Sequence, residues 1–162
     1  MIVDSFRFLP HSFRAAYDLE PVGAPQVWTD FAVRLGEASI ALLSTAGLYV
    51  EGIQEPYDLD RERAEPTWGD PSHRVIPHNA GQLGMAHLHV NDADTRADRN
   101  VSLPLDVLAE LVAEGVVGAS SPNHASVMGY QGDLNGWRDV TAPAITQLLT
   151  EQHTNGVVLA PA

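Results

Sequence analysis

Short, uninterrupted apolar runs alternate with segments of helical periodicity along this chain. The predicted strands are residues 38–43, 84–90, 116–119 and 156–161, with a short extended piece at 74–77. The predicted helices are residues 27–37, 104–114 and 142–153. Strands that are apolar throughout are typical of a parallel sheet covered by helices on both faces. The sequence therefore predicts an α/β fold, a single three-layer domain over residues 1–162 with a mostly parallel sheet.

Three polar stretches separate these elements and are predicted to be long loops: residues 52–72, 91–102 and 120–138. Loops of this length in a compact domain are usually functional or ordered by a partner. The acidic residues that begin at Asn91 have a faint likeness to a calcium loop. They lack its glycine at the sixth position and its glutamate at the twelfth, so we expect them to cap turns and helices instead.

Two residue types are absent, and their absence limits the chemistry. There is no cysteine among the 162 residues, and all nine basic residues are arginine. Without cysteine the chain has no thiolate nucleophile, disulfide, iron–sulfur cluster or zinc–thiolate site. Without lysine it has no imine-forming amine and no phosphate-loop lysine. Any reaction must use His, Asp, Glu, Ser, Thr, Tyr, Arg, a metal or a cofactor.

The formal charge of −12 limits the partners. Nucleic acids and anionic membranes attract basic surfaces, so neither is expected to bind this chain. No apolar run approaches the ~20 residues of a membrane span, and the first residues lack the pattern of a signal peptide. We therefore expect a cytoplasmic protein that acts on a small molecule.

Candidate site residues follow the predicted strands, because ligands bind at the carboxyl ends of parallel strands. His87 and His89, two apart on a predicted strand, would address one point. They suit an acid–base pair, or two ligands of Zn²⁺, Fe²⁺ or Cu²⁺, or one core and one surface histidine. A third metal ligand would come from a neighbouring loop. The candidates are His73, His78, Asp92 and His124.

The remaining candidates are His124, Arg74, Ser44 and Thr45. His124 is expected on a loop after a strand, where it is either catalytic or a solvated surface histidine. Arg74 either anchors a substrate carboxylate or forms a salt bridge to Asp70 or another loop carboxylate. Ser44 and Thr45 follow a strand and either bind an oxyanion or cap the next turn.

Eight motifs occur in an order that resembles one family. They are residues 3–10, 44–47, 69–77, 87–91, 98–101, 103–111, 115–118 and 128–130. Together they resemble the selenoprotein B family of glycine, sarcosine and betaine reductases and the related D-proline reductase subunit, over nearly the whole chain.

The resemblance implies a reductive cleavage of a carbon–nitrogen bond by a selenocysteine or cysteine that directly follows the final strand. This sequence ends at Ala162, where that residue is expected, and contains no cysteine. The reductive step therefore does not carry over. The resemblance implies a retained substrate pocket. Its expected residues are Ser44, Thr45, Arg74, His87, His89 and His124.

Three hypotheses follow. The first is an enzyme for redox-neutral acid–base chemistry (elimination, hydrolysis, isomerisation or cyclisation) on a small polar metabolite, in a pathway of specialised biosynthesis. His87 or His89 is then the base. The second is a metal-dependent enzyme with His87 and His89 as ligands. The third is a non-catalytic substrate-binding subunit of a split reductase complex, whose second chain supplies the redox residue. We also expect a homo-oligomer, most simply a dimer, because a stop directly after the last strand should expose the edge or end of that strand.

Overall fold

The computed structural model of the chain describes residues 29–65, 67–88 and 90–161. The chain groups into two compact units, Met1–Asp30 and Phe31–Ala162, and every element described below lies in the second. The single domain over residues 1–162 stays a prediction. No described helix is long and apolar enough to cross a membrane.

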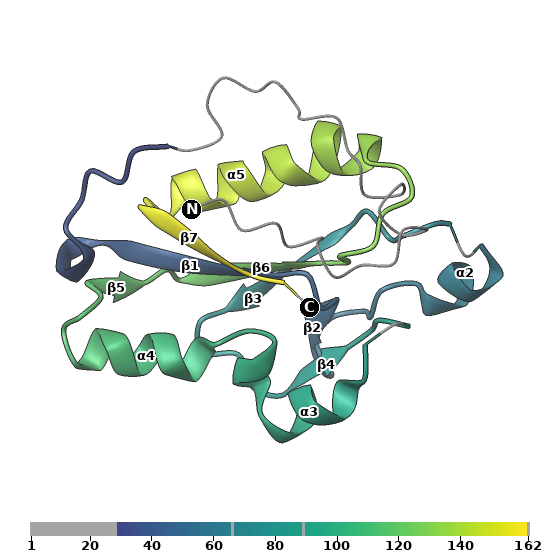
Figure 1. Ribbon diagram of the computed structural model, residues 1–162, viewed down its shortest axis with the longest axis horizontal. Helices are drawn as coiled ribbons and strands as arrows, with labels where there is room; N and C mark the ends of the chain where they lie inside the picture. The colour runs from purple at the N-terminus through teal and green to yellow at the C-terminus, as the bar shows by residue number, and fades with distance from the viewer. Residues whose placement is uncertain (1–28, 66, 89, 162) are drawn as a thin grey trace, which may run out of the picture. The chain divides into compact units, whose positions relative to one another are not determined.

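A mostly parallel sheet is built around β1 (Ser39–Ser44), as the apolar pattern predicts (Figure 1). On one side β1 pairs in parallel with β7 (Gly156–Ala160). On the other side it pairs in parallel with β5 (Ala119–Ser120) and then with β6 (Asn123–Val127). Beyond β6 lies β3 (His73–Pro77), which is antiparallel to it. The α/β fold class is confirmed.

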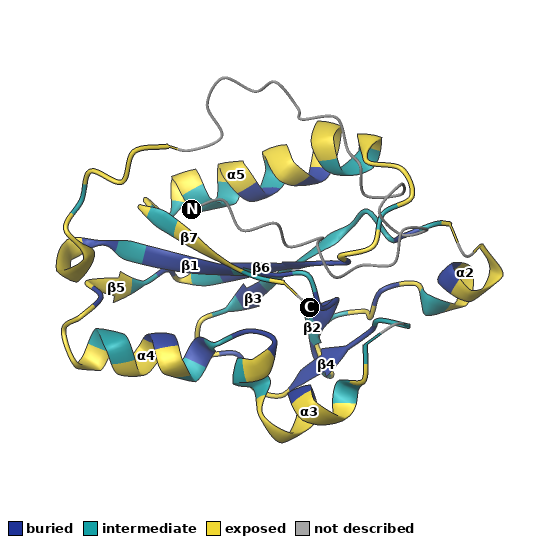
Figure 2. Cartoon of the chain, in the orientation of Figure 1, coloured by how far each residue is buried: buried dark blue, intermediate teal, exposed yellow. Residues whose placement is uncertain are grey.

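Helices cover both faces of this sheet because β1 is apolar on both sides. Ile40 and Leu42 belong to a buried cluster that includes Leu108 of α4 (Leu105–Ala113). Leu43 packs against the opposite cluster, which contains Ile145 of α5 (Ala142–Glu151). Figure 1 shows α4 and α5 on opposite sides of the sheet, and Figure 2 shows β1 as one of its most buried strands.

A second, two-stranded sheet lies on the α4 side. It pairs β2 (Leu48–Val50) with β4 (Leu83–Met85) in antiparallel register. The predicted strand 84–90 is therefore wrong in its length and in its sheet, because β4 ends at Met85.

The predicted carboxy-terminal helix begins earlier than expected, with a π-helical turn, Trp137–Thr141. Ala142 donates its N–H to the Trp137 carbonyl, five residues back. Pro143 follows and has no N–H to continue a regular ladder. The wider turn is the local arrangement that accommodates it.

The predicted loops contain elements that the sequence did not indicate. Segment 52–72 contains α2 (Leu59–Ala64). Segment 91–102 contains α3 (Asp92–Ala97), capped by Asn91 as expected of its polar residues, and the 3-10 turn Arg99–Val101. The error with most consequence is segment 120–138, because β6 lies within it.

The predicted helix 27–37 is also wrong over its described part. Only the 3-10 turn Leu35–Glu37 is helical, and Phe31 is exposed.

Candidate functional site

The turn at the carboxyl end of β1 is held by the Ser44 side chain and by backbone hydrogen bonds to two other segments. Ser44 is fully buried, and its hydroxyl accepts the Ala46 N–H at 3.2 Å. Gly47 has a φ of +64°, donates to the Val127 carbonyl at 3.0 Å and accepts from the Ala86 N–H at 2.9 Å. Ser44 therefore shapes the turn, and in this position it does not face solvent.

His87 lies beside this turn, because the Ala86–Gly47 hydrogen bond holds the preceding residue against it. The side chain of His87 is half-buried. It does not stand on a strand, so the argument that His87 and His89 point to one face does not apply. His89 lies outside the described residues. Of the predicted site residues, Ser44, Thr45 and His87 lie on the two backbone segments that the Ala86–Gly47 hydrogen bond joins.

His124 occupies an unexpected place inside the sheet. It lies in β6, fully buried, and its Nδ1 accepts the Leu42 N–H at 3.0 Å. Its Nε2 is 3.3 Å from the Ser120 hydroxyl. The expected position on a loop is therefore wrong. Burial, and secondarily the positive charge that His78 can carry, lower the pKa of His124 to about 4. A catalytic role for this ring stays a prediction, whereas its contact with Leu42 is structural.

Arg74 ties a loop to β3. Its guanidinium donates to the backbone carbonyls of Glu55 and Pro56 at 2.8 and 3.1 Å, and to the Ser72 hydroxyl at 2.8 Å. It also lies over the Tyr57 ring, 4.2 Å from the ring centre. These partners match neither of the two expectations for this side chain. Its role as a carboxylate anchor stays a prediction.

Asp70 supports the same loop through its carboxylate. It accepts the Ser72 N–H at 2.9 Å and the Asp58 N–H at 3.1 Å. Burial raises the pKa of Asp70, but the hydrogen bonds from Ser72 and Asp58 outweigh this effect and hold the pKa below its usual value. Burial also raises the pKa of Tyr57 well above its usual range. The phenol donates to the Ser126 carbonyl at 2.7 Å.

The candidate metal ligands are dispersed in the described part of the chain. His73 is on β3, His78 follows it, and Asp92 begins α3. Among the described residues, no group of three His, Cys, Asp or Glu side chains is placed to share an ion. Because His89 lies outside those residues, a Zn²⁺, Fe²⁺ or Cu²⁺ site at His87 and His89 stays a prediction.

A polar pocket of about 500 Å³ lies where α2 and the segment after it meet the segment that follows β6. Its polar lining includes Arg61, Glu65 and Asp133, and Trp68 supplies an aromatic wall. The Arg61 guanidinium lies 4.3 Å from the centre of the Trp68 ring and 3.2 Å from a Glu65 carboxylate oxygen. The pocket therefore presents one guanidinium and two carboxylates beside an indole.

Two glycines hold the pocket walls together. A Cβ on Gly69 would lie 1.9 Å from the Tyr130 carbonyl oxygen, and one on Gly132 would lie 1.7 Å from that of Thr67. Only glycine permits these approaches. Gln131 joins the same walls, because its amide donates to the Asp70 carbonyl at 2.8 Å.

This pocket lies at the carboxyl end of β6, the edge where parallel sheets bind ligands. The turn after β1 adjoins the same segment, since Gly129 donates to the Thr45 carbonyl at 2.9 Å. The sequence predicted a site at the carboxyl ends of the strands, but it did not indicate the pocket residues Arg61, Trp68 and Asp133. The Gly-Asp pairs at 69–70 and 132–133 were the available signal, and one sequence does not show that they meet.

The chain is 29% identical over 141 residues to D-proline reductase subunit gamma of Acetoanaerobium sticklandii, and the match covers 86% of this chain. It covers 54% of the relative, so this chain spans about half the length of that protein. No family model matches the sequence, and no solved structure matches it. The eight ordered motifs predicted a resemblance over nearly the whole chain, and the match covers 86% of it.

Proposed function

This chain is related to the selenoprotein B-like family of proline and glycine reductases, and on that basis we propose that it binds a small amino acid or amine substrate. The observation that carries the proposal is the match to a reductase subunit along 86% of the chain. The relative's name specifies D-proline, a small zwitterion. A secondary amine carrying a carboxylate is therefore the substrate class that we assign.

The polar pocket supports this class of ligand. A zwitterion needs a donor for its carboxylate and an acceptor for its ammonium group. Arg61 offers a planar guanidinium for the first, and Asp133 offers a carboxylate for the second. Trp68 supplies an apolar wall for a small ring and keeps the guanidinium in place.

A redox residue, if the chain takes part in a reduction, must come from outside these 162 residues, since none of them is cysteine. We therefore assign these residues the binding role in a larger assembly, another part of which supplies a thiol or selenol. The relative supports a protein partner, because it is itself a subunit.

Redox-neutral acid–base chemistry is the second candidate. The observation that favours it is the place of His87, held beside the turn after β1 by the Ala86–Gly47 hydrogen bond. An imidazole at this edge is a candidate general base for a bound substrate. His89 would be its partner.

Isothermal titration calorimetry with D-proline tests the binding role. The wild-type chain is expected to bind, and Arg61→Gln is expected to weaken binding about tenfold or more, as loss of a charged carboxylate contact does. Arg63→Gln is the matched control, because Arg63 lies on the same helix, pairs with Asp60 and does not line the pocket. No binding of D-proline, sarcosine, glycine or betaine to the wild type would refute the proposal.

The second candidate has a separate test. The chain alone, without thiol or reductant, is incubated with each ligand that binds, and the products are followed by proton NMR. Turnover that is lost in His87→Ala but kept in Arg63→Gln supports acid–base chemistry. Binding without turnover supports the binding role and excludes acid–base catalysis on those ligands.

A further inference from the structure

The outermost strand of the described sheet has apolar side chains in solvent on both of its faces. Val157, Val158 and Leu159 of β7 are 42%, 48% and 68% exposed. In Figure 2 this strand is largely yellow, whereas the neighbouring β1 is mostly dark blue. Residues two apart point to the same face, so Val157 and Leu159 share one face and Val158 lies on the other.

This pattern is that of an interior strand. Edge strands usually carry charges, proline or bulges that prevent pairing with another chain. Within the described residues, β7 pairs with β1 and has no second neighbour, and none of Gly156–Ala160 is charged. Its outer backbone groups therefore offer a row of donors and acceptors between two apolar faces.

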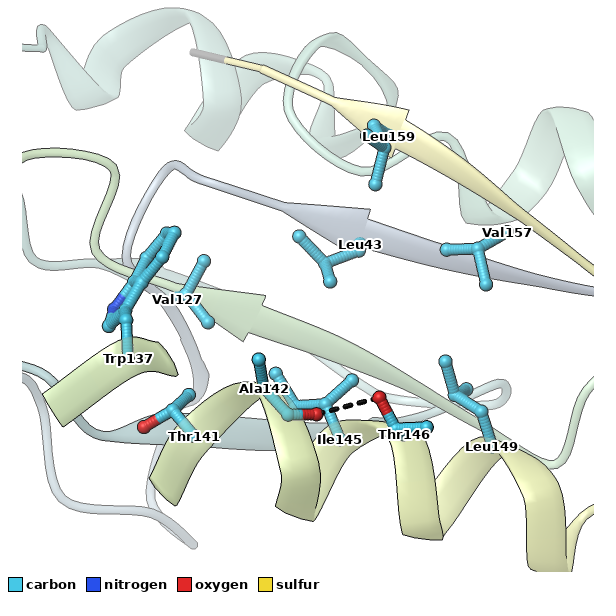
Figure 3. A pocket seen from close by; sticks show the side chains of 10 residues that line it. All are labelled: Leu43, Val127, Trp137, Thr141, Ala142, Ile145, Thr146, Leu149, Val157 and Leu159. Carbon is cyan, nitrogen blue, oxygen red and sulfur yellow. Dashed lines mark hydrogen bonds between the residues drawn. The ribbon is translucent and has the colours of Figure 1, made fainter. Parts of the chain in front are cut away.

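The apolar surface extends from β7 toward α5. Val157 and Leu159 line a pocket of about 290 Å³ that Ile145 and Leu149 of α5 close from the other side (Figure 3). Trp137 stands at one end of this pocket. All ten residues that line it are uncharged.

The charge distribution favours another copy of this chain as the occupant. One residue in five is charged over the whole sequence, and the formal charge is −12. From Thr141 to Pro161, Glu151 is the one Asp, Glu, Lys or Arg. A basic partner would be met by carboxylates, which this surface lacks. Two acidic copies can approach each other only through a surface that is free of like charge.

We propose that two copies of this chain dimerise through β7, paired antiparallel across a two-fold axis, so that the two sheets become one. A two-fold axis perpendicular to a sheet makes equivalent strands antiparallel, so that a residue before the axis on one strand faces a residue after it on the other. With the axis at Val158, Val157 of each copy meets Leu159 of the other on the α5 face, and the two copies of Val158 meet on the α4 face.

Sedimentation equilibrium of the full chain at roughly 5–100 µM, where a dimer with a micromolar Kd is populated, tests this proposal. The wild type is expected at twice the 17.5 kDa chain mass. Val158→Asp is expected to give the mass of one chain, because it places like charges in the contact. Ile53→Asp is the control: Ile53 is 81% exposed in the turn after β2 and belongs neither to β7 nor to the pocket beside it, and this variant is expected to remain dimeric.

Far-UV circular dichroism checks that each variant folds, and Leu159→Asp decides the outcome if Val158→Asp does not fold. A wild type that stays monomeric throughout the range overturns the proposal. So does an assembly that persists in both β7 variants, or one that Ile53→Asp dissociates equally. Binding of D-proline by the β7 variants is expected to equal that of the wild type, so this proposal and the proposed function fail separately.

Discussion

The imidazole Nδ1 of His124 accepts the backbone N–H of Leu42 at 3.0 Å, inside the sheet. This contact falls where the neighbour of β1 changes from β5 to β6, with Ser121 and Pro122 between them. A side chain thus takes a place that a backbone carbonyl holds in a regular ladder. The contact requires a neutral ring whose Nδ1 is unprotonated.

Removal of this acceptor is expected to destabilise the fold. His124→Ala leaves the Leu42 N–H unpaired and opens a cavity, which together cost about 3 kcal/mol of unfolding free energy. His124→Asn keeps an acceptor oxygen and is expected to recover part of that loss. Urea denaturation followed by circular dichroism measures both. Equal stability of the two variants would contradict the role of the hydrogen bond.

The same residue makes stability depend on pH. His124 has a pKa of about 4 in the folded chain and an ordinary value near 6.5 when unfolded. Between these values the unfolded state binds the proton more tightly, so the free energy of unfolding falls as pH decreases from about 6.5 to 4. The loss is at most about 3 kcal/mol. In His124→Asn this part of the pH profile is expected to flatten, which denaturation at several pH values will show.

Gly47 is expected to be intolerant of any side chain. A Cβ there would lie 2.4 Å from the Ala86 carbonyl oxygen, and the φ of +64° already disfavours other residues. Gly52 is the matched control, with a φ of +74° and no atom within 4 Å of its Cβ. Gly52→Ala should cost about 1 kcal/mol, from φ alone. Gly47→Ala should cost clearly more, and similar melting temperatures for the two variants would exclude the steric argument.

The Arg74→Lys variant distinguishes a structural role of Arg74 from a role as a carboxylate anchor. If its guanidinium holds the loop at Glu55 and Pro56, Arg74→Lys loses the fork of donors and lowers the free energy of unfolding by about 1–2 kcal/mol. The affinity for D-proline is then expected to stay within twofold of wild type. A carboxylate anchor would give the reverse result: near-normal stability and a large loss of affinity. Denaturation and calorimetry on the same variant distinguish these outcomes.

His153 ends α5 in a conformation that suits glycine. Its φ is +55°, and the Thr154 N–H that follows donates to the Leu149 carbonyl at 3.0 Å. His153→Gly is expected to raise the free energy of unfolding by about 1 kcal/mol, because glycine adopts this φ without strain. His153→Ala keeps the strain and should give no such gain. Thermal unfolding of both variants measures the difference.

The sequence predicted best those elements in which the apolar pattern agrees with the residues that begin and end helices, such as proline and glycine. β1 and β7 are continuous apolar runs, and α4 lies between Pro104 and Gly115. For each of them the local sequence is consistent with the tertiary contacts. The mostly parallel sheet followed from these elements alone.

β6 was missed because its sequence, Asn-His-Ala-Ser-Val, is half polar. Its polar groups are paired inside the core: His124 with Leu42, and the Ser126 hydroxyl with the Leu48 N–H at 2.8 Å. Hydropathy alone does not show that a buried polar side chain will find a backbone partner. The pocket residues were missed for a related reason, because Arg61 and Asp133 meet only once the strands are in order.

The close approaches of Gly69 and Gly132 fix the spacing between the two backbone segments that form the walls of the polar pocket. Gly69 approaches the Tyr130 carbonyl while Gly132 approaches that of Thr67, so each strip of backbone is held by the other. A change of loop length or of either glycine would displace both strips at once. In the binding role that we propose, exchange of the side chains of Arg61, Trp68 and Asp133 would change the ligand, while the spacing of the walls would stay the same.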